Sequence, residues 1–249
     1  VNDAFGVLHR RHASVSAVPE CFEHVAAGGL IERETSALNK VLQPWPKPLV
    51  VVLGGAKVAD KILMIENLSN YCKDICIGGA MAYTFLKAKG ISVGSSRVEE
   101  DKIEVASQIL RVCEQRGVQL HLPVDHIVAS DFAENAEATA VTELEDGFMG
   151  LDIGPQTLAN YQELLAGAGC IFWNGPMGVS EWESFAKGTR GVASALAECE
   201  GYSVVGGGDS AAAVNDFGFT EQINHVSTGG GASLALLGGE SLPGLEALS

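Results

Sequence analysis

Short apolar runs that end in a cluster of glycines recur along most of this chain. The runs lie at residues 48–53, 74–77, 169–173, 202–205 and 225–227, and each leads through glycines into a stretch with helical periodicity. Strands with no polar face, alternating with helices, are typical of a parallel sheet that is covered on both sides. The pattern therefore predicts an α/β fold with a doubly wound parallel sheet in a three-layer αβα arrangement.

The segments between these units predict two longer helices, one more strand and an exposed excursion. Helical periodicity runs from about 58 to 70 and from about 99 to 115. An apolar run near 119–122 predicts the strand. The stretch from 131 to 146 is polar and acidic, and we expect it to be exposed.

The glycine clusters are the main indication of a ligand. In an open α/β sheet the strand-to-helix turns lie together at the carboxyl edge, where ligands bind. Glycine lets backbone N–H groups approach a phosphate closely, and each following helix begins with a positive dipole end. A simpler interpretation is that glycine only permits tight turns. Because five such turns share one edge, the sequence favours a ligand that carries phosphate.

Two common nucleotide signatures are absent from the sequence. There is no G-x-x-x-x-G-K-[ST] motif, which excludes a P-loop enzyme. There is also no G-x-G-x-x-G that opens a helix with an acidic residue about 20 positions later. An unrelated α/β oxidoreductase therefore remains only a secondary alternative, which competition between ADP and NADH would distinguish.

Charge and hydropathy narrow the range of partners. The 249 residues include 16 basic and 31 acidic ones, for a net charge of −15. Such a surface repels nucleic acid and anionic lipid, although a few local cations can still form one positive pocket. The longest apolar run, at 48–53, is far shorter than the roughly 20 residues that span a bilayer. No leader pattern opens the sequence, so we expect a cytoplasmic protein with neither nucleic acid nor membrane as a partner.

The six cysteines are scattered, and most of them sit in apolar runs. Cys72 and Cys76 are four residues apart, but no second pair follows at a spacing that would bind zinc. We expect buried free thiols, which suit a reducing cytoplasm.

Seven sequence blocks resemble the phosphoglycerate kinase family in order and spacing. They are VNDAFG at 1–6 with His9-Arg10, GGAKVADK at 54–61, GGAMAYTFLK at 78–87, GLDIGP at 150–155, WNGPMG at 173–178, GGGDS at 206–210 and STGGGAS at 227–233. The resemblance covers essentially the whole chain. It implies a glycolytic enzyme that reversibly transfers a phosphoryl group between 1,3-bisphosphoglycerate with ADP and 3-phosphoglycerate with ATP, with Mg²⁺ as cofactor. It also implies a monomer with small-molecule substrates.

The same resemblance implies two doubly wound domains that face each other across a cleft. Residues 1–20 would be a remnant of the first, 3-phosphoglycerate-binding domain, with its last strand and loop in 1–14. Residues 21–42 would form a helical connection, and 43–237 the nucleotide-binding domain. Residues 238–249 would be a tail that returns to the first domain. Most of the basic patch for 3-phosphoglycerate would precede this segment, which leaves Arg10 for substrate, with His9 beside it.

Individual roles follow from the resemblance as well. Lys57, expected at a helix start, would contact the transferred phosphoryl group, and Lys61, one turn later on the same face, the nucleotide phosphates. Asp209 would bind Mg²⁺, because that ion prefers oxygen ligands, although an Asp at this position is commonly only a helix cap. Gly208 and Gly230 would join Lys57 in catalysis.

The other residues implied in nucleotide binding divide by the part of the ligand they would contact. They are Gly78, Gly79, Leu151, Asn174 and Pro176 around adenine, Glu181 at the ribose, and Gly55, Gly207, Ser210, Thr228 and Gly229 at the phosphates.

Three positions depart from the family pattern. Ser180 stands where an aromatic residue is usual and would remove a wall near the ribose. Ala80 replaces a glycine, and Ala235 replaces an acidic residue. None of the three removes a catalytic group. A nucleotide-binding module without turnover of its own is the first alternative function for the chain taken alone.

Overall fold

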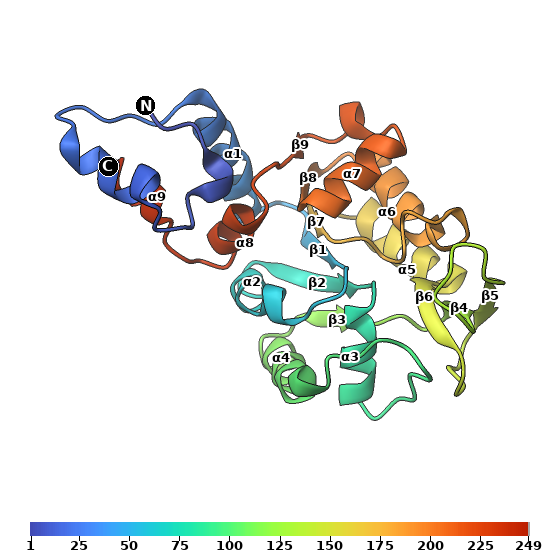
Figure 1. Cartoon of the computed structure of the whole chain (residues 1–249). Helices are drawn as coiled ribbons and strands as arrows, with labels where there is room; N and C mark the ends of the chain where they lie inside the picture. Colours follow the sequence, from blue (N-terminus) through green and yellow to red (C-terminus); the bar gives the residue numbers. More distant parts are fainter. Residues whose placement is uncertain (249) are drawn as a thin grey trace.

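A six-stranded parallel sheet forms the centre of the computed structural model, which describes residues 1–248 (Figure 1). Its strand order is β3-β2-β1-β7-β8-β9. The strands are β1 (Leu49–Leu53), β2 (Cys72–Ile77), β3 (Gln119–His121), β7 (Cys170–Asn174), β8 (Tyr202–Gly206) and β9 (His225–Val226). Every neighbouring pair is parallel, so all six predicted strands lie in one sheet and the predicted fold class is confirmed.

Alternate residues of β1 face two separate layers of helices. Val51 and Leu53 belong to one core, and Val50 and Val52 belong to the other. The first core receives α1 (Gly29–Val41), α2 (Ile62–Leu68), α3 (Met81–Ala88), α4 (Ile103–Gln115) and α8 (Gly231–Leu237). The second receives α5 (Pro155–Ala166), α6 (Lys187–Glu198) and α7 (Gly208–Asp216).

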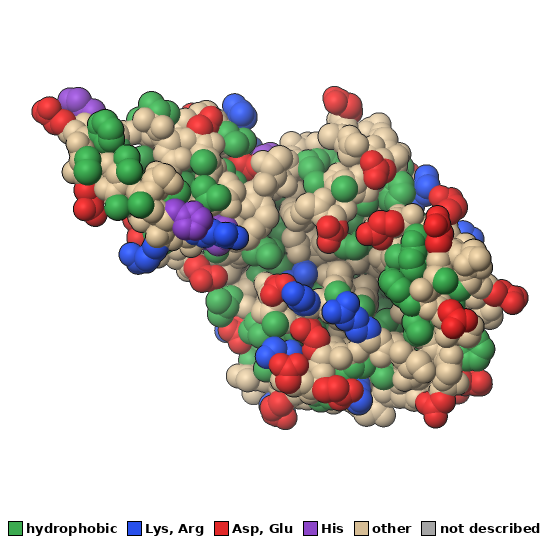
Figure 2. All heavy atoms as spheres, in the orientation of Figure 1, with side chains coloured by type: hydrophobic (Ala, Val, Ile, Leu, Met, Phe, Trp, Pro, Cys, Tyr) green, Lys and Arg blue, Asp and Glu red, His purple; other side chains and the backbone are tan. Residues whose placement is uncertain are grey.

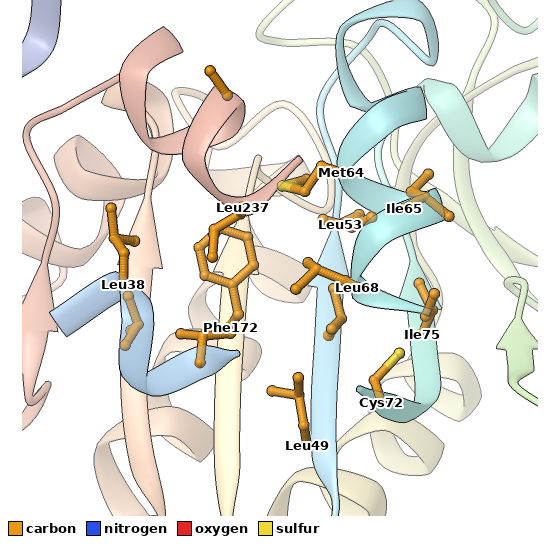
Figure 3. Packing of buried hydrophobic residues seen from close by; sticks show 14 of the residues in the cluster. Leu38, Leu49, Leu53, Met64, Ile65, Leu68, Cys72, Ile75, Phe172 and Leu237 are labelled. Atoms are coloured by element: carbon orange, nitrogen blue, oxygen red, sulfur yellow. The ribbon is translucent and has the colours of Figure 1, made fainter. Parts of the chain in front are cut away.

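The first core is continuous from α1 across the sheet to α2. Leu38 of α1, Phe172 of β7 and Leu68 of α2 are each fully buried and lie along this layer (Figure 3). Because both faces of the central strands are covered in this way, their sequences contain no polar alternation.

The direction of winding reverses between β1 and β7. The chain builds β2 and β3 outward on one side of β1, and it builds β8 and β9 outward beyond β7. At such a switch point the two turns at the carboxyl ends diverge and leave a crevice, which is where ligands bind in open α/β sheets.

Glycine turns at this switch point interlock through their backbones. The Gly54 N–H donates to the Asn174 carbonyl at 2.9 Å, and the Gly55 N–H donates to the Pro176 carbonyl at 2.8 Å. A Cβ on Gly175, whose φ is +93°, would lie 2.3 Å from the Gly54 carbonyl oxygen. At these turns glycine permits close packing, and the N–H groups of Gly54 and Gly55 bind protein carbonyls, while a phosphate at this edge stays a prediction.

The stretch from 131 to 146 is largely exposed, as expected, but it also contains a strand that the sequence did not predict. It contains β5 (Thr139–Val141), which pairs with β4 (His126–Ala129), and β4 pairs in turn with β6 (Met149–Ile153) in an antiparallel sheet. The sequence pattern does not predict β5, because the strand is short and only Val141 in it is half-buried. No apolar alternation is left to detect.

Both longer helices begin later than their periodicity predicts. The 3₁₀ turn Ala59–Lys61 precedes α2, and the 3₁₀ turn Glu100–Lys102 precedes α4. Further short helical turns are Phe5–Val7, Ala13–Ala17, Val18–Cys21, Glu183–Phe185 and Thr220–Gln222.

The first 28 residues form turns rather than a strand and a helix. The strand expected in 1–14 is reduced to an isolated bridge between Asn2 and Ala27. The connection expected to be helical from 21 becomes an α-helix only at Gly29. There the Asp3 carboxylate accepts hydrogen bonds from the N–H groups of Leu30 and Ile31, at 2.7 and 3.1 Å. This cap fixes the start of α1.

The C-terminal segment packs against the N-terminal one. The Gly244 N–H of α9 (Pro243–Glu246) donates to the Leu8 carbonyl at 2.9 Å, and a Cβ on Gly244 would lie 2.4 Å from Val15 Cγ1. Both ends of the chain accordingly lie on the same side of the molecule (Figure 1). Residue 249 of the expected tail lies outside the described residues, and the domain boundaries stay a prediction.

All six cysteines are free, as expected. Four are buried, Cys199 is half-buried, and Cys21 is exposed, so Cys21 departs from the expectation of burial. Within residues 1–248, none of the helices combines the length and the apolar character needed to cross a bilayer.

The interlocked turns generate a first prediction. We expect Gly175→Ala to destabilise the chain more than Gly90→Ala, which has a φ of +76° but nothing within 4 Å of its Cβ position. The control places a Cβ in the left-handed backbone region with no other contact, which costs about 1–2 kcal/mol. Gly175→Ala adds a clash with a backbone carbonyl, which costs about 1–3 kcal/mol more. Urea unfolding measures both, and equal losses would contradict the role of the close approach.

Candidate functional site

A cavity of about 700 Å³ opens beside the switch point. Its wall includes six residues that the sequence predicted for nucleotide binding: Gly55, Gly79, Leu151, Pro176, Glu181 and Asp209. They come from the turns after β1, β2 and β7, from β6 and from α7. On the face drawn in Figure 2, acidic side chains are spread widely, whereas several Lys and Arg side chains gather near its centre.

Lys61 carries a buried positive charge beside Gly55, one of the wall residues. The side chain is 8% exposed, and its Nζ stands 3.7 Å from the position that a Cβ on Gly55 would occupy. Burial lowers the pKa of Lys61, and the negative charges of Asp60, Asp209 and Glu99 offset part of that effect. Within the described chain, none of these carboxylates is close enough to form an ion pair with it. A buried, unpaired ammonium is costly, and an anion bound here would remove that cost.

Lys57 is not on the same helix as Lys61, contrary to the prediction. It is exposed in the irregular turn that follows Gly55. The next residue, Val58, is buried, and its N–H donates to the Glu99 carboxylate. That bond holds the turn in place, so the helical periodicity of 58–70 does not extend to Lys57.

Asp209 does not cap a helix in this structure. The N-cap of α7 is Gly207, with a φ of +92°, and Asp209 is the second residue of the helix. Its carboxylate is exposed and lines the cavity, and it has no hydrogen bond or ion pair to any residue in 1–248. The carboxylate is therefore available to a ligand, in the first turn where the dipole favours negative charge.

Asn174 and Ser210 support the cavity wall from behind and do not line it. Asn174 Nδ2 donates to the Gly206 carbonyl at 2.7 Å. Ser210 is fully buried, and its Oγ accepts the Gly175 N–H at 2.6 Å. Gly207 fits only because it lacks a Cβ, which would lie 2.7 Å from Asn174 Nδ2. These residues position the turns after β7 and β8.

Gly78 likewise lies behind the cavity surface. Its N–H donates to the Leu53 carbonyl at 2.7 Å, and a Cβ on it would lie 2.5 Å from Met177 Sδ. The neighbouring Gly79 N–H donates to the Met177 carbonyl at 2.8 Å. The adjacent turns therefore pack against each other backbone to backbone.

A loop after β9 holds Thr228, Gly229 and Gly230, at the same sheet edge as the cavity but outside its wall. Glu34 of α1 is 1% exposed and accepts the Thr228 N–H at 2.9 Å and the Thr228 Oγ1–H at 3.0 Å. His225 Nε2 lies 2.8 Å from the same carboxylate. Burial alone would raise the pKa of Glu34, but these hydrogen bonds lower it to about 2. The loop is thus tied to α1 through a charged carboxylate.

Arg10 lies near the start of α8 rather than in the cavity. Its Nε donates to His9 Nε2 at 3.3 Å. A Cβ on Gly231, the first residue of α8, would lie 2.8 Å from His9 Nε2. His9 therefore packs against the helix start, with the exposed Arg10 beside it.

Two aromatic residues in the wall were missed by the sequence reasoning. Phe132 and Trp182 both line the cavity, with ring centroids 4.6 Å apart. The cavity thus has aromatic wall residues at other positions, and the expected loss of a wall near the ribose at Ser180 stays a prediction. In the sequence, each of these two residues is an isolated aromatic residue in a polar segment. Only the fold shows that Phe132 and Trp182 meet.

Asp152 is a buried carboxylate that joins both ends of the segment 178–188. It is 2% exposed, and it accepts the Gly188 N–H at 2.7 Å and the Ile153 N–H at 2.9 Å. A Cβ on either Gly178 or Gly188 would lie 2.4 Å from its Oδ1. Burial raises the pKa of Asp152 to about 7, although the two N–H groups and Lys187 act to lower it. Glu181 and Trp182 lie on the segment that this carboxylate holds.

This raised pKa predicts a pH dependence of stability. The folded pKa of about 7 lies above the ordinary value of 3.8, so ionisation of Asp152 costs stability as pH rises from about 4 to 7. The loss is roughly 4 kcal/mol and complete above pH 7. We expect Asp152→Asn to match the parent near pH 4 and to be more stable at pH 8 in urea unfolding. A parallel decline of both proteins would contradict the assignment.

Comparison with known proteins gives one consistent result. A sequence model described as phosphoglycerate kinase matches residues 1–240. The chain is 51% identical over 249 residues to phosphoglycerate kinase from Anaeromyxobacter dehalogenans (strain 2CP-C), covering 99% of this chain and 63% of that protein. It is 52% identical over 250 residues to phosphoglycerate kinase from Clostridium perfringens (strain SM101 / Type A), with 100% and 63% covered. The chain thus spans 63% of the length of these relatives.

Solved structures agree with the sequence comparison. The structure of phosphoglycerate kinase from Coxiella burnetii superposes with a TM-score of 0.94 at 43% identity, covering 99% of this chain and 65% of that one. That of phosphoglycerate kinase from Pyrococcus horikoshii OT3 superposes with a TM-score of 0.87 at 35% identity, covering 99% and 62%.

Proposed function

Because this chain belongs to the phosphoglycerate kinase family, we propose that it supplies the nucleotide side of that family's reaction. The reaction is the reversible transfer of a phosphoryl group between 1,3-bisphosphoglycerate with ADP and 3-phosphoglycerate with ATP. One observation carries the proposal for this site. A buried ammonium with no ion-pair partner in residues 1–248, Lys61, lies next to the wall residue Gly55, and an available carboxylate, Asp209, lines the same cavity at the switch point.

The wall residues offer a different kind of contact to each part of a nucleotide. Leu151 and Gly79 offer apolar and flat backbone surface to a base. Glu181 is a further wall residue, and its carboxylate accepts the ribose hydroxyls. Lys61 meets the phosphates, because they are the part of the nucleotide whose negative charge a cation binds, and Gly55 lies beside it.

The residues present fit a Mg²⁺ ion that is shared with the nucleotide. Mg²⁺ is usually bound through one or two carboxylates together with substrate phosphates. Within residues 1–248, no cluster of three or more His, Cys, Asp or Glu side chains could hold a metal by itself. Asp209 alone faces the expected phosphates, so it would hold the ion jointly with them. When bound, the ion neutralises charge on the phosphate oxygens.

Positive charge and backbone donors around the transferred group would lower the barrier to transfer. The exposed Lys57 ammonium is free to move onto the phosphoryl group. Gly208, the first residue of α7, and Gly230 with Thr228 and Gly229 before α8 contribute backbone at the same sheet edge. Arg10, beside the start of α8, would bind 3-phosphoglycerate from the other side.

The chain spans 63% of the length of its relatives, and this supports a second proposal, about the chain taken alone. Catalysis requires both reactants to be held in one near-attack geometry, which accounts for roughly 7–11 kcal/mol of barrier reduction. In this chain the acceptor side rests on Arg10 and His9. We infer that the isolated chain is a Mg-nucleotide-binding module, that it acts as a monomer, and that its free thiols suit the cytoplasm.

Binding and turnover of the chain test both statements together. We expect calorimetry to show saturable binding of Mg-ADP, and a coupled assay with 3-phosphoglycerate and ATP to show no turnover above background. NADH should not compete with ADP. Absence of ADP binding would overturn the proposed function, and turnover equal to that of a full-length relative would overturn the inference about the isolated chain.

Asp209→Asn separates metal binding from other roles of this carboxylate. We expect the Mg²⁺ dependence of ADP affinity to fall by roughly 10-fold or more, because a neutral amide is a poor ligand for a hard dication. The matched control is Asp216→Asn, which removes one charge from the exposed far end of α7. Calorimetry with and without Mg²⁺ measures the dependence, and melting curves should show unchanged folding for both. If Mg²⁺ dependence survived in Asp209→Asn, another group would have to hold the ion.

A further inference from the structure

One strand in the cavity wall carries a carboxylate that is almost completely buried. Asp152 of β6 is 2% exposed, and it lines the cavity together with Gly178, Glu181 and Trp182. These three lie in the segment 178–188 between β7 and α6, which includes the residue proposed for the ribose. Because Asp152 is too buried to be the main contact for a ligand, its effect on binding passes through this segment.

The backbone of the segment sets the position of Glu181. The Glu181 side chain is exposed and has no hydrogen bond or ion pair to any residue in 1–248. Near its start the segment is fixed by the Val179 N–H, which donates to the Leu151 carbonyl at 2.9 Å. Further along, Phe185 is fully buried. The remaining end of the segment is held by Asp152.

Asp152 caps α6 from a neighbouring strand. The first N–H groups of a helix have no partner within it, and Ala186, at the N-cap position of α6, supplies no side-chain hydrogen bond. Asp152 Oδ2 accepts the Gly188 N–H at 2.7 Å, while Oδ1 accepts the Ile153 N–H at 2.9 Å. Negative charge is favoured at this end of a helix. The ionised carboxylate therefore fixes the point at which the segment joins α6.

We propose that Asp152 is a positioning residue for Glu181, and that its ionised form holds the segment where Glu181 binds the ribose. This inference rests on the proposed function. Each oxygen of the carboxylate faces an N–H group, so a proton on either one turns an acceptor into a donor. Charge-assisted hydrogen bonds are also roughly twice as strong as neutral ones. Protonation of Asp152 therefore weakens the hold on Gly188 and, through it, the ribose contact of Glu181.

The charge of Asp152 changes within an accessible range of pH. Burial raises its pKa to about 7, although the two N–H groups and Lys187 of α6 act to lower it. On the paired strand β4, burial lowers the pKa of His126 to about 4, so that its ring is neutral near pH 7. On α3, burial and the charge of Asp152 raise the pKa of Tyr83, which stays neutral as well. The change in charge between about pH 5.5 and pH 8 therefore belongs to Asp152.

The preference of the chain for ribose hydroxyls tests the proposal. Calorimetry near pH 5.5 and pH 8 gives the ratio of the Kd of Mg-2′,3′-dideoxy-ADP to that of Mg-ADP. Both ligands carry the same phosphates, so the titration of the phosphates cancels in the ratio. For the parent we expect the ratio to fall roughly 5-fold from pH 8 to pH 5.5, as for the loss of one hydrogen bond. For Asp152→Asn, whose amide has a single acceptor oxygen, we expect the low ratio at both pH values.

Glu183→Gln is the matched control for the loss of a carboxylate. Glu183 lies on the same segment, is exposed, and pairs with Arg190 on the surface. This variant should keep the ratio of the parent at both pH values. Melting curves at each pH show that the proteins compared are folded, and Asp152→Asn should fold because it removes a costly buried charge.

Two results would overturn the inference. If Asp152→Asn had the ratio of the parent at pH 8, whether both ligands or neither bound more weakly, the carboxylate would not act through the ribose contact. If the ratio of Asp152→Asn still fell with pH, another group would be responsible. In both cases ADP binding by the parent would leave the proposed function intact. A parent that bound no ADP at pH 8 would overturn the proposed function and this inference with it.

Discussion

The close approach of two backbone turns at the switch point is the constraint on which the rest of the site depends. Gly54 and Gly175 meet where side chains would collide, and the Gly54 N–H closes on the Asn174 carbonyl. Buried backbone polar groups need partners, and here they find them in each other. The diverging sheet halves are thereby joined at one edge, with the cavity beside the joint. The glycines at this edge allow the turns to pack closely, and the charged side chains are the groups proposed to bind the ligand.

Asp209 in the cavity wall and Lys61 beside the wall residue Gly55 carry opposite charges that a ligand could bind. Lys61 is buried without a pairing carboxylate, and Asp209 is exposed without a donor, both within residues 1–248. The two are close enough for Asp209 to raise the pKa of Lys61, yet they do not form an ion pair. A phosphate with a divalent cation satisfies both groups at once, whereas either ion alone satisfies only one. The site thus favours a metal–nucleotide complex over its separate components.

Two buried carboxylates, of which Asp152 lies in the cavity wall, hold neighbouring segments in place. Asp152 ties together the ends of the segment that carries Glu181 and Trp182. Glu34 ties the loop after β9 to α1, the helix that leads out of the N-terminal segment. The environments differ, because Glu34 receives three hydrogen bonds and stays ionised, whereas burial makes Asp152 titrate near neutrality. The carboxylate of Glu34 therefore stays charged near neutral pH, whereas the charge of Asp152 depends on pH.

Local pattern alone determined the sheet, its parallel pairing and the edge at which the glycine turns meet, because fully buried strands leave continuous apolar runs. Resemblance to the family placed Gly55, Gly79, Leu151, Pro176, Glu181 and Asp209, all of which line the cavity. The tertiary structure decided what depends on distant contacts. Glu99 binds the N–H of Val58, 41 residues away, and so keeps Lys57 off the helix. Phe132 and Trp182 meet across 50 residues, and Arg97 reaches the same wall. Such contacts leave no period in the sequence, since each joins a single residue to one far along the chain.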